Sequence, residues 1–166
     1  SLMTTKPEGW VQLFRMSGGV MSGILDGINI LDLSRILAGP YTAQMLSDLG
    51  ANVTKIEAPW GDDTRGWGPP FATDFDGDRV AAYFLCCNRG KTILQMDLKE
   101  EKDRLMELIE WADVIVENFK PGTLERLIGP LPNDTIVCSI SGYGATGPRR
   151  NEPGYDLALQ ARSGIM

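Results

Sequence analysis

The sequence predicts an α/β protein with a Rossmann-like parallel sheet flanked by helices. Short apolar runs, which are typical of buried strands, alternate with amphipathic segments from residue 27 onward. Strict alternation of this kind indicates parallel strands that are joined by right-handed helical crossovers. The chain has 166 residues, of which 43% are hydrophobic, and this is sufficient for one domain with a substantial core.

Each expected element has its own pattern. Short runs rich in Val, Ile and Leu are the expected strands, at residues 27–33, 51–58, 92–98, 113–119 and 134–141. The segments between them predict helices at residues 41–50, 79–87, 100–112 and 121–128, and a further helix begins at Tyr155. Gly50 is typical of a helix end, acids fill the first turn of residues 100–112, and Pro121 is typical of a helix start.

Two stretches depart from this alternation. Residues 59–77 are full of Pro, Gly, Asp and Trp, and we expect a long loop there. Residues 1–23 are rich in Gly, Ser and Met without a clean period, so we expect a flexible leader or an expression remnant. A poor mitochondrial presequence is the alternative, because Lys6 and Arg15 stand against a single acid. The predicted domain therefore covers residues 24–166.

Composition excludes several classes of function. The formal net charge of −6 argues against a general nucleic-acid surface, and no apolar run approaches the ~20 residues that cross a bilayer. The cysteines Cys86, Cys87 and Cys138 form no CxxC pair, so we expect neither a disulfide framework nor a zinc site and favour a reducing compartment. The chain has no histidine, which excludes from it a Ser-His-Asp triad, a Cys-His pair and a HExxH site.

Ligands of parallel α/β sheets bind at the carboxyl ends of the strands. Segments at these ends carry basic residues, namely Arg35, Lys55, Arg65, Lys99, Lys120 and Arg126. Each of them alone is typical of a solvated surface charge. If several converge at one edge of the sheet, they would form a phosphate site in an otherwise acidic protein.

A glycine motif follows the fifth expected strand. Gly142, Gly144 and Gly147 match GxGxxG, but a dinucleotide site requires a helix that opens at the third glycine and a place after the first strand. Here a loop continues after Gly147, so a flexible loop near a site is the favoured interpretation. The sequence GxxxxGK(S/T) of a P-loop does not occur.

Aromatic and acidic residues mark two further segments. Trp60 and Trp67 flank the sequence GDDTR, and they predict either a binding lid or a segment packed on a partner chain. Asp156 follows Tyr155 at a boundary between loop and helix, where an aspartate is common for structural reasons alone.

The order and spacing of several segments resemble the family III CoA-transferases of the CaiB–BaiF type, which also include the α-methylacyl-CoA racemases. These segments are GINILDLSRILAGP and GDDTRGWGPPF, then NRGKTILQMDLK, ADVIVENFKPGTLERL and SISGYGATGP…GYD. The resemblance covers residues 27–166. It implies a CoA-binding domain, the N-terminal part of the large domain of an interlocked homodimer, truncated before the family's C-terminal part.

The resemblance also implies a set of CoA contacts. Ile36, Leu37 and Ala38 stand where the family's first loop meets the thiol arm and the acyl group. Ala58 holds a position that is often Arg in the family. The other implied contacts follow later strands, and they are Met96, Asp97, Leu98 and Lys99, then Asn118, Phe119 and Lys120, then Arg126, and finally Pro153, Gly154 and Tyr155. Lys99 and Arg126 are the implied partners of the phosphates, which require cationic donors.

The two branches of the family differ in chemistry. By resemblance, the transferases attack the thioester with an aspartate carboxylate and form a mixed anhydride, whereas the racemases move the α-proton with a His and an Asp. The racemase motif GHD reads Gly154-Tyr155-Asp156 here, and a tyrosine with a pKa of ~10 does not replace histidine near neutral pH. We therefore favour the transferase branch, with Asp156 in a supporting catalytic role. The nucleophilic Asp is expected beyond Met166, and it is neither Asp62 nor Asp63.

The expected function is transfer of CoA between an acyl-CoA thioester and a small carboxylic acid. The sequence GDDTRGWGPPF resembles transferases of dicarboxylates such as succinate and glutarate. A racemase-type enzyme and an inactive CoA-binding fragment remain the alternatives. We expect a soluble homodimer in the cytoplasm or the mitochondrial matrix, with acyl-CoA and a carboxylic acid as substrates and no metal, nucleic acid or membrane partner.

Overall fold

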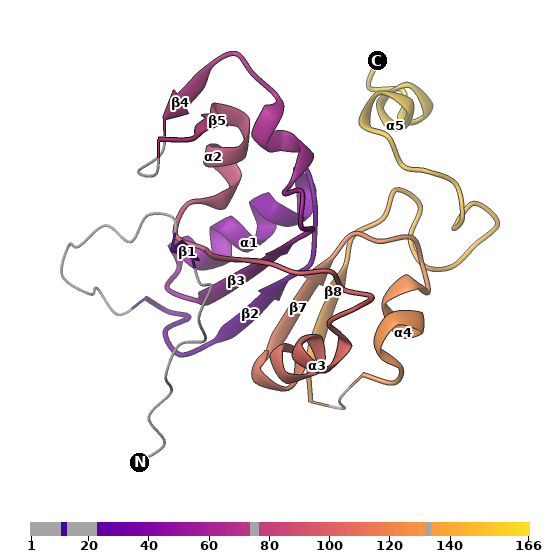
Figure 1. The fold of residues 1–166 in the computed structure, drawn as a ribbon. Coiled ribbons are helices and arrows are strands. Elements are labelled where there is room, and N and C mark those ends of the chain that lie inside the picture. Colours follow the sequence, from indigo (N-terminus) through magenta and orange to yellow (C-terminus); the bar gives the residue numbers. More distant parts are fainter. Residues whose placement is uncertain (1–10, 13–22, 74–76, 132–133) are drawn as a thin grey trace.

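A computed structural model of the chain describes residues 11–12, 23–73, 77–131 and 134–166, and it contains a sheet with helices on both faces (Figure 1). The strand order is β1-β6-β3-β2-β7-β8, in which the five strands from β6 to β8 are parallel and β1 pairs antiparallel with β6. The strands are β1 (Val11–Gln12), β2 (Asn29–Asp32), β3 (Asn52–Glu57), β6 (Thr92–Gln95), β7 (Val114–Glu117) and β8 (Ile136–Ser139). The predicted Rossmann-like parallel sheet is confirmed.

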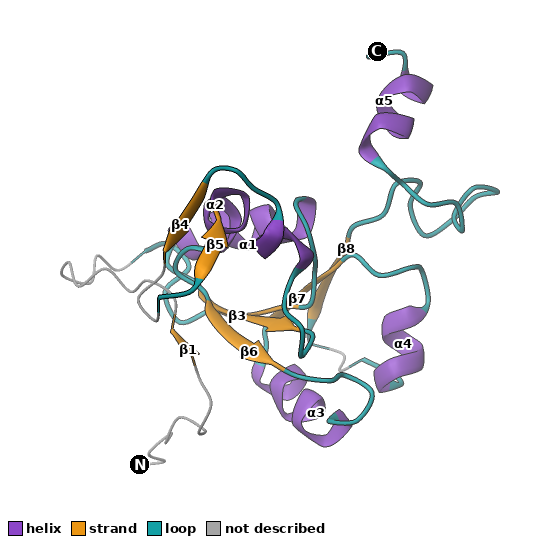
Figure 2. Ribbon diagram, turned by 45° about the horizontal axis from the view of Figure 1, so that its top comes forward, coloured by secondary structure: helices purple, strands orange, loops and turns teal. Residues whose placement is uncertain are grey.

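Helices cover both faces of this sheet (Figure 2). On one face lie α1 (Ala38–Asp48) and α2 (Ala82–Asn88), and on the other lie α3 (Lys102–Trp111) and α4 (Thr123–Ile128). Helix α5 (Asp156–Ser163) follows β8 and stands apart from the sheet. Within the described ranges, no helix combines the length and the apolar character needed to cross a membrane.

The main core lies between the sheet and helices α3 and α4. Leu31 and Leu33 face this side, whereas Ile30 and Asp32 face α1, because successive side chains of a strand point to opposite faces. The buried residues of the main core are Leu31, Leu33, Ile56, Leu94, Met96, Leu105, Leu108, Ile109, Ala112, Ile115 and Leu124. A smaller core under α1 contains Ile30, Ala43, Ala51, Val53 and Val116.

The structure corrects the prediction for residues 59–87. The predicted long loop contains a 3-10 helix, η1 (Asp63–Gly66), and a strand, β4 (Phe71–Thr73). Strand β4 pairs antiparallel with β5 (Arg79–Ala81), which occupies the start of the predicted helix 79–87. The Arg79 guanidinium lies 3.8 Å from the centre of the Phe71 ring. This contact joins β4 and β5, whose sequences lack the alternation of apolar and polar residues that predicts a strand.

Smaller differences concern element ends. Helix α1 begins at Ala38 and therefore includes Pro40, which is tolerated in a first helical turn. Pro121 precedes α4, because Gly122 takes a left-handed φ of 76° immediately before the helix. Val11 and Gln12, within the predicted leader, pair with β6 as β1. The rest of residues 1–22 lies outside the described residues.

The sheet face under α1 holds a buried ion pair instead of an apolar contact. Lys91 and Asp32 are both fully buried, and the Lys91 Nζ lies 2.8 Å from Asp32 Oδ2. The same ammonium donates to the Pro40 carbonyl at 2.8 Å and to Asn88 Oδ1 at 3.0 Å, so its three protons all have acceptors. Burial lowers the pKa of Lys91, and the Asp32 charge opposes this effect. Lys91 thereby connects β2 with the start of α1 and the end of α2.

Removal of one partner from this pair should destabilise the fold strongly. We expect Lys91→Met to lower the free energy of unfolding by about 3–5 kcal/mol, because Asp32 keeps a buried charge without a counter-charge. Adding Asp32→Asn should recover part of the loss. Urea unfolding followed by circular dichroism measures both effects.

The control is Arg89→Met, which removes a neighbouring cation whose pair with Asp48 is half-exposed. That change should cost no more than about 1 kcal/mol. Equal stability of the Lys91→Met and Arg89→Met variants would contradict the role assigned to the buried pair.

Candidate functional site

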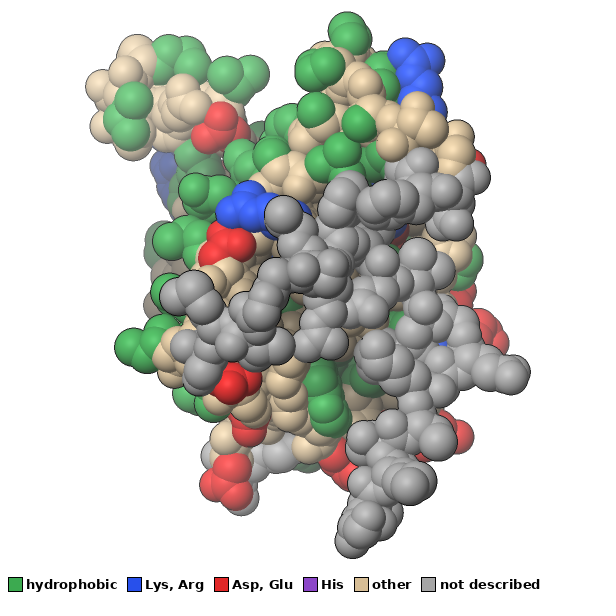
Figure 3. Space-filling view, turned by 90° about the vertical axis from the view of Figure 1, so that its left-hand side faces the viewer, with side chains coloured by type: hydrophobic (Ala, Val, Ile, Leu, Met, Phe, Trp, Pro, Cys, Tyr) green, Lys and Arg blue, Asp and Glu red, His purple; other side chains and the backbone are tan. Residues whose placement is uncertain are grey.

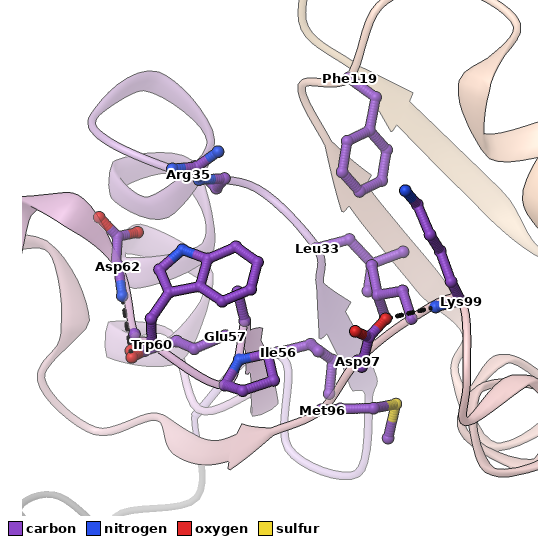
Figure 4. A pocket seen from close by; sticks show the side chains of 14 residues that line it. Leu33, Arg35, Ile56, Glu57, Trp60, Asp62, Met96, Asp97, Lys99 and Phe119 are labelled. Atoms are coloured by element: carbon purple, nitrogen blue, oxygen red, sulfur yellow. Dashed lines mark hydrogen bonds between the residues drawn. The ribbon is translucent and has the colours of Figure 1, made fainter.

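A cavity of about 320 Å³ opens at the carboxyl ends of the central strands (Figure 4). It lies where the strand order reverses between β2 and β7, the usual ligand position in such sheets. Its apolar surface comes from Leu33, Ile56, Met96, Trp60 and Phe119. The other lining residues are Arg35, Glu57, Ala58, Pro59, Gly61, Asp62, Asp97, Leu98 and Lys99.

The loop after β2 is fixed by the loop after β7. Asn118 Nδ2 donates to the Arg35 carbonyl at 2.8 Å, and the Arg35 backbone N–H donates to Asn118 Oδ1 at 3.0 Å. The next residue, Ile36, has a φ of 71°, a conformation that costs a β-branched residue about 1–3 kcal/mol. Its N–H points to Asp62 Oδ2 at 3.4 Å. The surrounding loops therefore hold this strained backbone at one rim of the cavity.

The start of α1 approaches the same loop closely. A Cβ atom at Gly39 would lie 2.2 Å from the Cβ and Oγ atoms of Ser34. The Ser34 carbonyl accepts a hydrogen bond of 2.7 Å from Lys55 Nζ, so this contact also depends on a buried cation of β3. Glycine at position 39 is required by this approach.

The GDDTR segment is bound to the sheet by a second buried network. Asp62 Oδ2 lies 3.2 Å from Lys55 Nζ, and Asp62 Oδ1 accepts from the backbone and the hydroxyl of Thr64. Arg65 donates to both carboxylate oxygens of Glu57, at 2.8 and 3.0 Å, and lies 4.0 Å from the centre of the Phe84 ring. These contacts position the segment beside the cavity.

Asp62 keeps its charge despite burial. Burial by itself raises the pKa of Asp62, but the Lys55 ammonium and the hydrogen bonds from Thr64 outweigh it. The pKa consequently lies below the ordinary aspartate value of 3.8. Because the side chain is only 1% exposed and already has these partners, Asp62 has a structural role and cannot attack a ligand.

The structure brings together part of the set of predicted contacts. Ala58, Met96, Asp97, Leu98, Lys99 and Phe119 line the cavity. Asn118 fixes the adjacent loop, while Ile36, Leu37 and Ala38 follow Arg35 and are exposed at the start of α1. The remaining predicted residues lie outside the lining and are exposed, and they are Lys120, Arg126, Pro153, Gly154, Tyr155 and Asp156. The Arg126 guanidinium donates to Thr123 Oγ1 at 2.9 Å. Asp156 Oδ2 accepts from Gln160 Nε2 at 2.7 Å in the first turn of α5.

The six basic residues near the strand ends have different environments. Lys55 is fully buried, so its interpretation as a solvated surface charge is wrong, and the Arg65 guanidinium is paired with Glu57. Arg35 and Lys99 line the cavity from opposite sides (Figure 4). Within the described ranges the Lys99 ammonium has no hydrogen-bond or ion-pair partner. Among the described residues, the cavity lining therefore offers Lys99, a cation without a partner, and Arg35, a cation that is paired with Asp63.

The sequence did not assign Arg35 or Trp60 to the predicted contacts. Trp60 is 75% exposed and its indole lies against the cavity, two residues after Ala58. An exposed tryptophan directly after a strand end was the available signal. Arg35 was visible as a basic residue at a strand end, but its partner lies 28 positions away in η1.

The glycine motif has a structural explanation. A Cβ atom at Gly142 would lie 2.4 Å from the Cα atom of Gly154, so two loops cross at this point. Gly144 and Gly147 have left-handed φ values of 77° and 91°. The loop continues beyond Gly147, and α5 begins only at Asp156. These glycines serve chain geometry, in agreement with the loop that the sequence predicts.

Comparison with known proteins gives consistent matches. The family model described as CoA-transferase family III matches residues 25–166. Succinate–glutarate CoA-transferase from Agrobacterium fabrum is 44% identical over 152 residues, covering 86% of this chain and 38% of that protein. Succinyl-CoA:mesaconate CoA-transferase from Haloarcula hispanica is 43% identical over 156 residues, covering 87% of this chain and 39% of that protein.

A solved structure has the same fold. The crystal structure of a CAIB/BAIF family protein from Brucella suis superimposes with a TM-score of 0.80 at 47% identity, covering 87% of this chain and 40% of that chain. This chain thus spans about 40% of the length of the relatives that it matches.

The shifted pKa of Asp62 gives a test by pH. Its lowered pKa contributes stability that is present in full above the ordinary value of 3.8 and is lost as pH falls through the folded-state pKa. We expect Asp62→Asn to cost about 3 kcal/mol at pH 7, because Lys55 loses its counter-charge. The difference in the free energy of unfolding between this variant and wild type should become smaller below about pH 4, where Asp62 itself becomes protonated.

Urea unfolding at several pH values measures this difference. The matched control is Asp63→Asn, because Asp63 is the half-exposed neighbour. This change should lower the free energy of unfolding by no more than about 1 kcal/mol. A difference for Asp62→Asn that stays constant from pH 7 to the acid limit would show that the Asp62 charge does not stabilise the fold.

Proposed function

This chain belongs to CoA-transferase family III, and from this premise we propose that it forms the CoA-binding part of an enzyme that transfers CoA to a small carboxylic acid. The observation that carries the proposal is the cavity at the strand ends. It has an apolar surface and, at its rim, the Lys99 ammonium, which has no partner among the residues that the structure describes. CoA requires both features, because its phosphates need cationic donors and its pantetheine and acyl parts need apolar contact.

The proposed contacts follow the lining of the cavity. Lys99 binds a phosphate of CoA, while Met96, Phe119 and Trp60 contact its less polar parts. Ala58 is small and uncharged at a position that is often Arg in the family, so it leaves space for the ligand. Trp60, two residues later, contributes an aromatic face. Ile36, Leu37 and Ala38 contact the thiol arm and the acyl group. The further contacts proposed on the neighbouring surface are Asp97, Leu98, Asn118, Lys120, Arg126, Pro153, Gly154 and Tyr155.

We propose covalent transfer through an aspartate. Its carboxylate oxygen attacks the thioester carbonyl carbon, the C–S bond breaks, and the CoA thiolate leaves while a mixed anhydride forms. Asp62 and Glu57 are occupied by Lys55 and Arg65, so neither is a candidate for this step. We place the nucleophile in the part of the protein that the relatives have beyond the matched region. Asp156 is proposed as a supporting group.

The acid is proposed to be a dicarboxylate. The relatives named above are described as transferases of succinate, glutarate and mesaconate, and the chain is 43–44% identical to them.

We further propose a homodimer in a reducing compartment, the cytoplasm or the mitochondrial matrix. One apolar stripe supports a covered surface. Leu37 and Leu49, which flank α1, and Tyr41 and Met45 within it recur at every fourth position and are 47–54% exposed. Hydrophobic side chains also gather in the upper part of the face in Figure 3.

Binding of CoA tests the site directly. We expect Lys99→Met to weaken CoA binding about tenfold or more in isothermal titration calorimetry, because a charge-assisted contact to phosphate is lost. Lys102→Met is the control, since it removes the same charge from an exposed position of α3 outside the cavity. Equal affinities of the two variants would refute the phosphate contact.

Activity is tested on a protein that has the length of the relatives. With succinyl-CoA and glutarate, we expect mass spectrometry to detect glutaryl-CoA and free succinate. CoA binding without any transfer would instead indicate a binding module. Exchange of the α-proton in deuterated water, again without transfer, would indicate a racemase-type enzyme.

A further inference from the structure

Arg35 differs from the other cations around the cavity. Its guanidinium lies at the rim opposite Lys99 (Figure 4). The Arg35 Nη2 donates to Asp63 Oδ2 at 2.5 Å. Both side chains are about half exposed, at 50% and 48%. An ion pair in such a position is worth at most about 1 kcal/mol, so either partner can exchange it for another ion.

The other arginine near the cavity cannot exchange its partner in this way. Arg65 donates to both oxygens of Glu57, whose side chain is fully buried, and it stacks on Phe84. Breaking this pair would leave a buried carboxylate without a cation, which is costly. Arg35 is therefore the arginine of the cavity lining that is able to bind an incoming anion.

The backbone of Arg35 is nevertheless rigidly placed. Asn118 binds both its N–H and its carbonyl, the preceding carbonyl accepts from Lys55, and the following N–H points to Asp62. Asp63 is also attached to a fixed segment, because the neighbouring Asp62 is anchored to Lys55 and Thr64. Exchange at Arg35 thus requires only rotation of the Asp63 side chain. The cost of organising the site is small for this reason.

We propose that Arg35 binds the free carboxylate of the dicarboxylate substrate, and that Asp63 occupies this carboxylate subsite when it is empty. This inference rests on the proposed function and assigns a residue to its substrate class. A guanidinium presents two parallel donors that match a carboxylate. The pairing pattern fits the chemistry. Lys99 has no partner within the described part of the chain and suits the phosphate that remains bound, whereas Arg35 has an internal partner and suits an acid that enters and leaves.

The internal partner also limits the selectivity of the subsite. A polar site that is left unpaired by the wrong substrate rejects it by several orders of magnitude. Here Asp63 neutralises Arg35 when the substrate has no second carboxylate, so the penalty for a monocarboxylate is small. We therefore expect a preference of about tenfold for the dicarboxylate over a monocarboxylate of similar length.

Two stable thioethers of CoA provide the test. S-(3-carboxypropyl)-CoA carries the free carboxylate, S-butyl-CoA carries a methyl group in its place, and neither can transfer its chain. Calorimetry gives the affinity of each. We expect wild type to prefer the carboxylate about tenfold, Arg35→Met to lose the preference, and Arg35→Lys to keep part of it. Affinity for S-butyl-CoA should stay the same in all three proteins.

A second variant should shift the preference in the opposite direction. Asp63→Asn removes the internal competitor, so we expect the preference for the carboxylate to rise about threefold. Lys99→Met serves as the control, because it should weaken both thioethers and leave their ratio unchanged. A purely structural role of the Arg35–Asp63 pair would make the Arg35→Met and Asp63→Asn variants change in the same direction.

The possible failures are distinguishable. If wild type binds neither thioether, both the CoA site and the carboxylate subsite are wrong. If it binds both equally, if Arg35→Met keeps the preference, or if Asp63→Asn lowers it, the carboxylate subsite is wrong while CoA binding stands.

Discussion

Lys55 of β3 and Lys91, which directly precedes β6, are fully buried between the sheet and the segments that cover it, and their need for partners constrains the loops beside the cavity. A buried ammonium without partners is very costly, so each lysine needs a carboxylate and carbonyl or amide acceptors at fixed distances. For Lys91 these acceptors are Asp32 of β2, Pro40 of α1 and Asn88 of α2. For Lys55 they are the Ser34 carbonyl, in the loop after β2, and Asp62 of the GDDTR segment. Elements that are far apart in sequence are consequently held in one arrangement. The cavity lies directly beside this network.

The network separates rigid groups from groups that remain available to a ligand. Asp62, Glu57 and Arg65 are paired within the structure and hold the loop that follows β3. Arg35 and Lys99 have their side chains at the surface of the cavity, where water and ligands have access. Rigid support beneath exposed cations reduces the cost of organising a binding site. The strained Ile36 is maintained by the same contacts, which is the pattern expected next to a functional site.

The sequence predicted the parallel sheet and its helices, but neither the β4–β5 hairpin nor all of the site. Alternating apolar runs predicted the five parallel strands, because burial on both faces produces a pattern that is visible locally. Strands β4 and β5 were missed, because their sequences do not alternate between apolar and polar residues. The contact between Phe71 and Arg79 that joins them cannot be read from a local pattern. The rule for strand ends and the family resemblance located Ala58, Met96 and Lys99. The burial of Lys55 and the pairing of Arg35 with Asp63 depend on contacts between distant segments, so no local pattern reveals them.

The central claim is that CoA binds at the carboxyl ends of β2, β3, β6 and β7. The most direct measurement is a titration of the isotopically labelled protein with CoA, followed by nuclear magnetic resonance of the backbone amides and the Trp60 indole N–H. The expected result is a set of shifts at Trp60, Lys99, Phe119 and the loop after β2, with little change at Lys102. Shifts confined to the glycine loop of residues 142–147, or no shifts at saturating CoA, would contradict the claim.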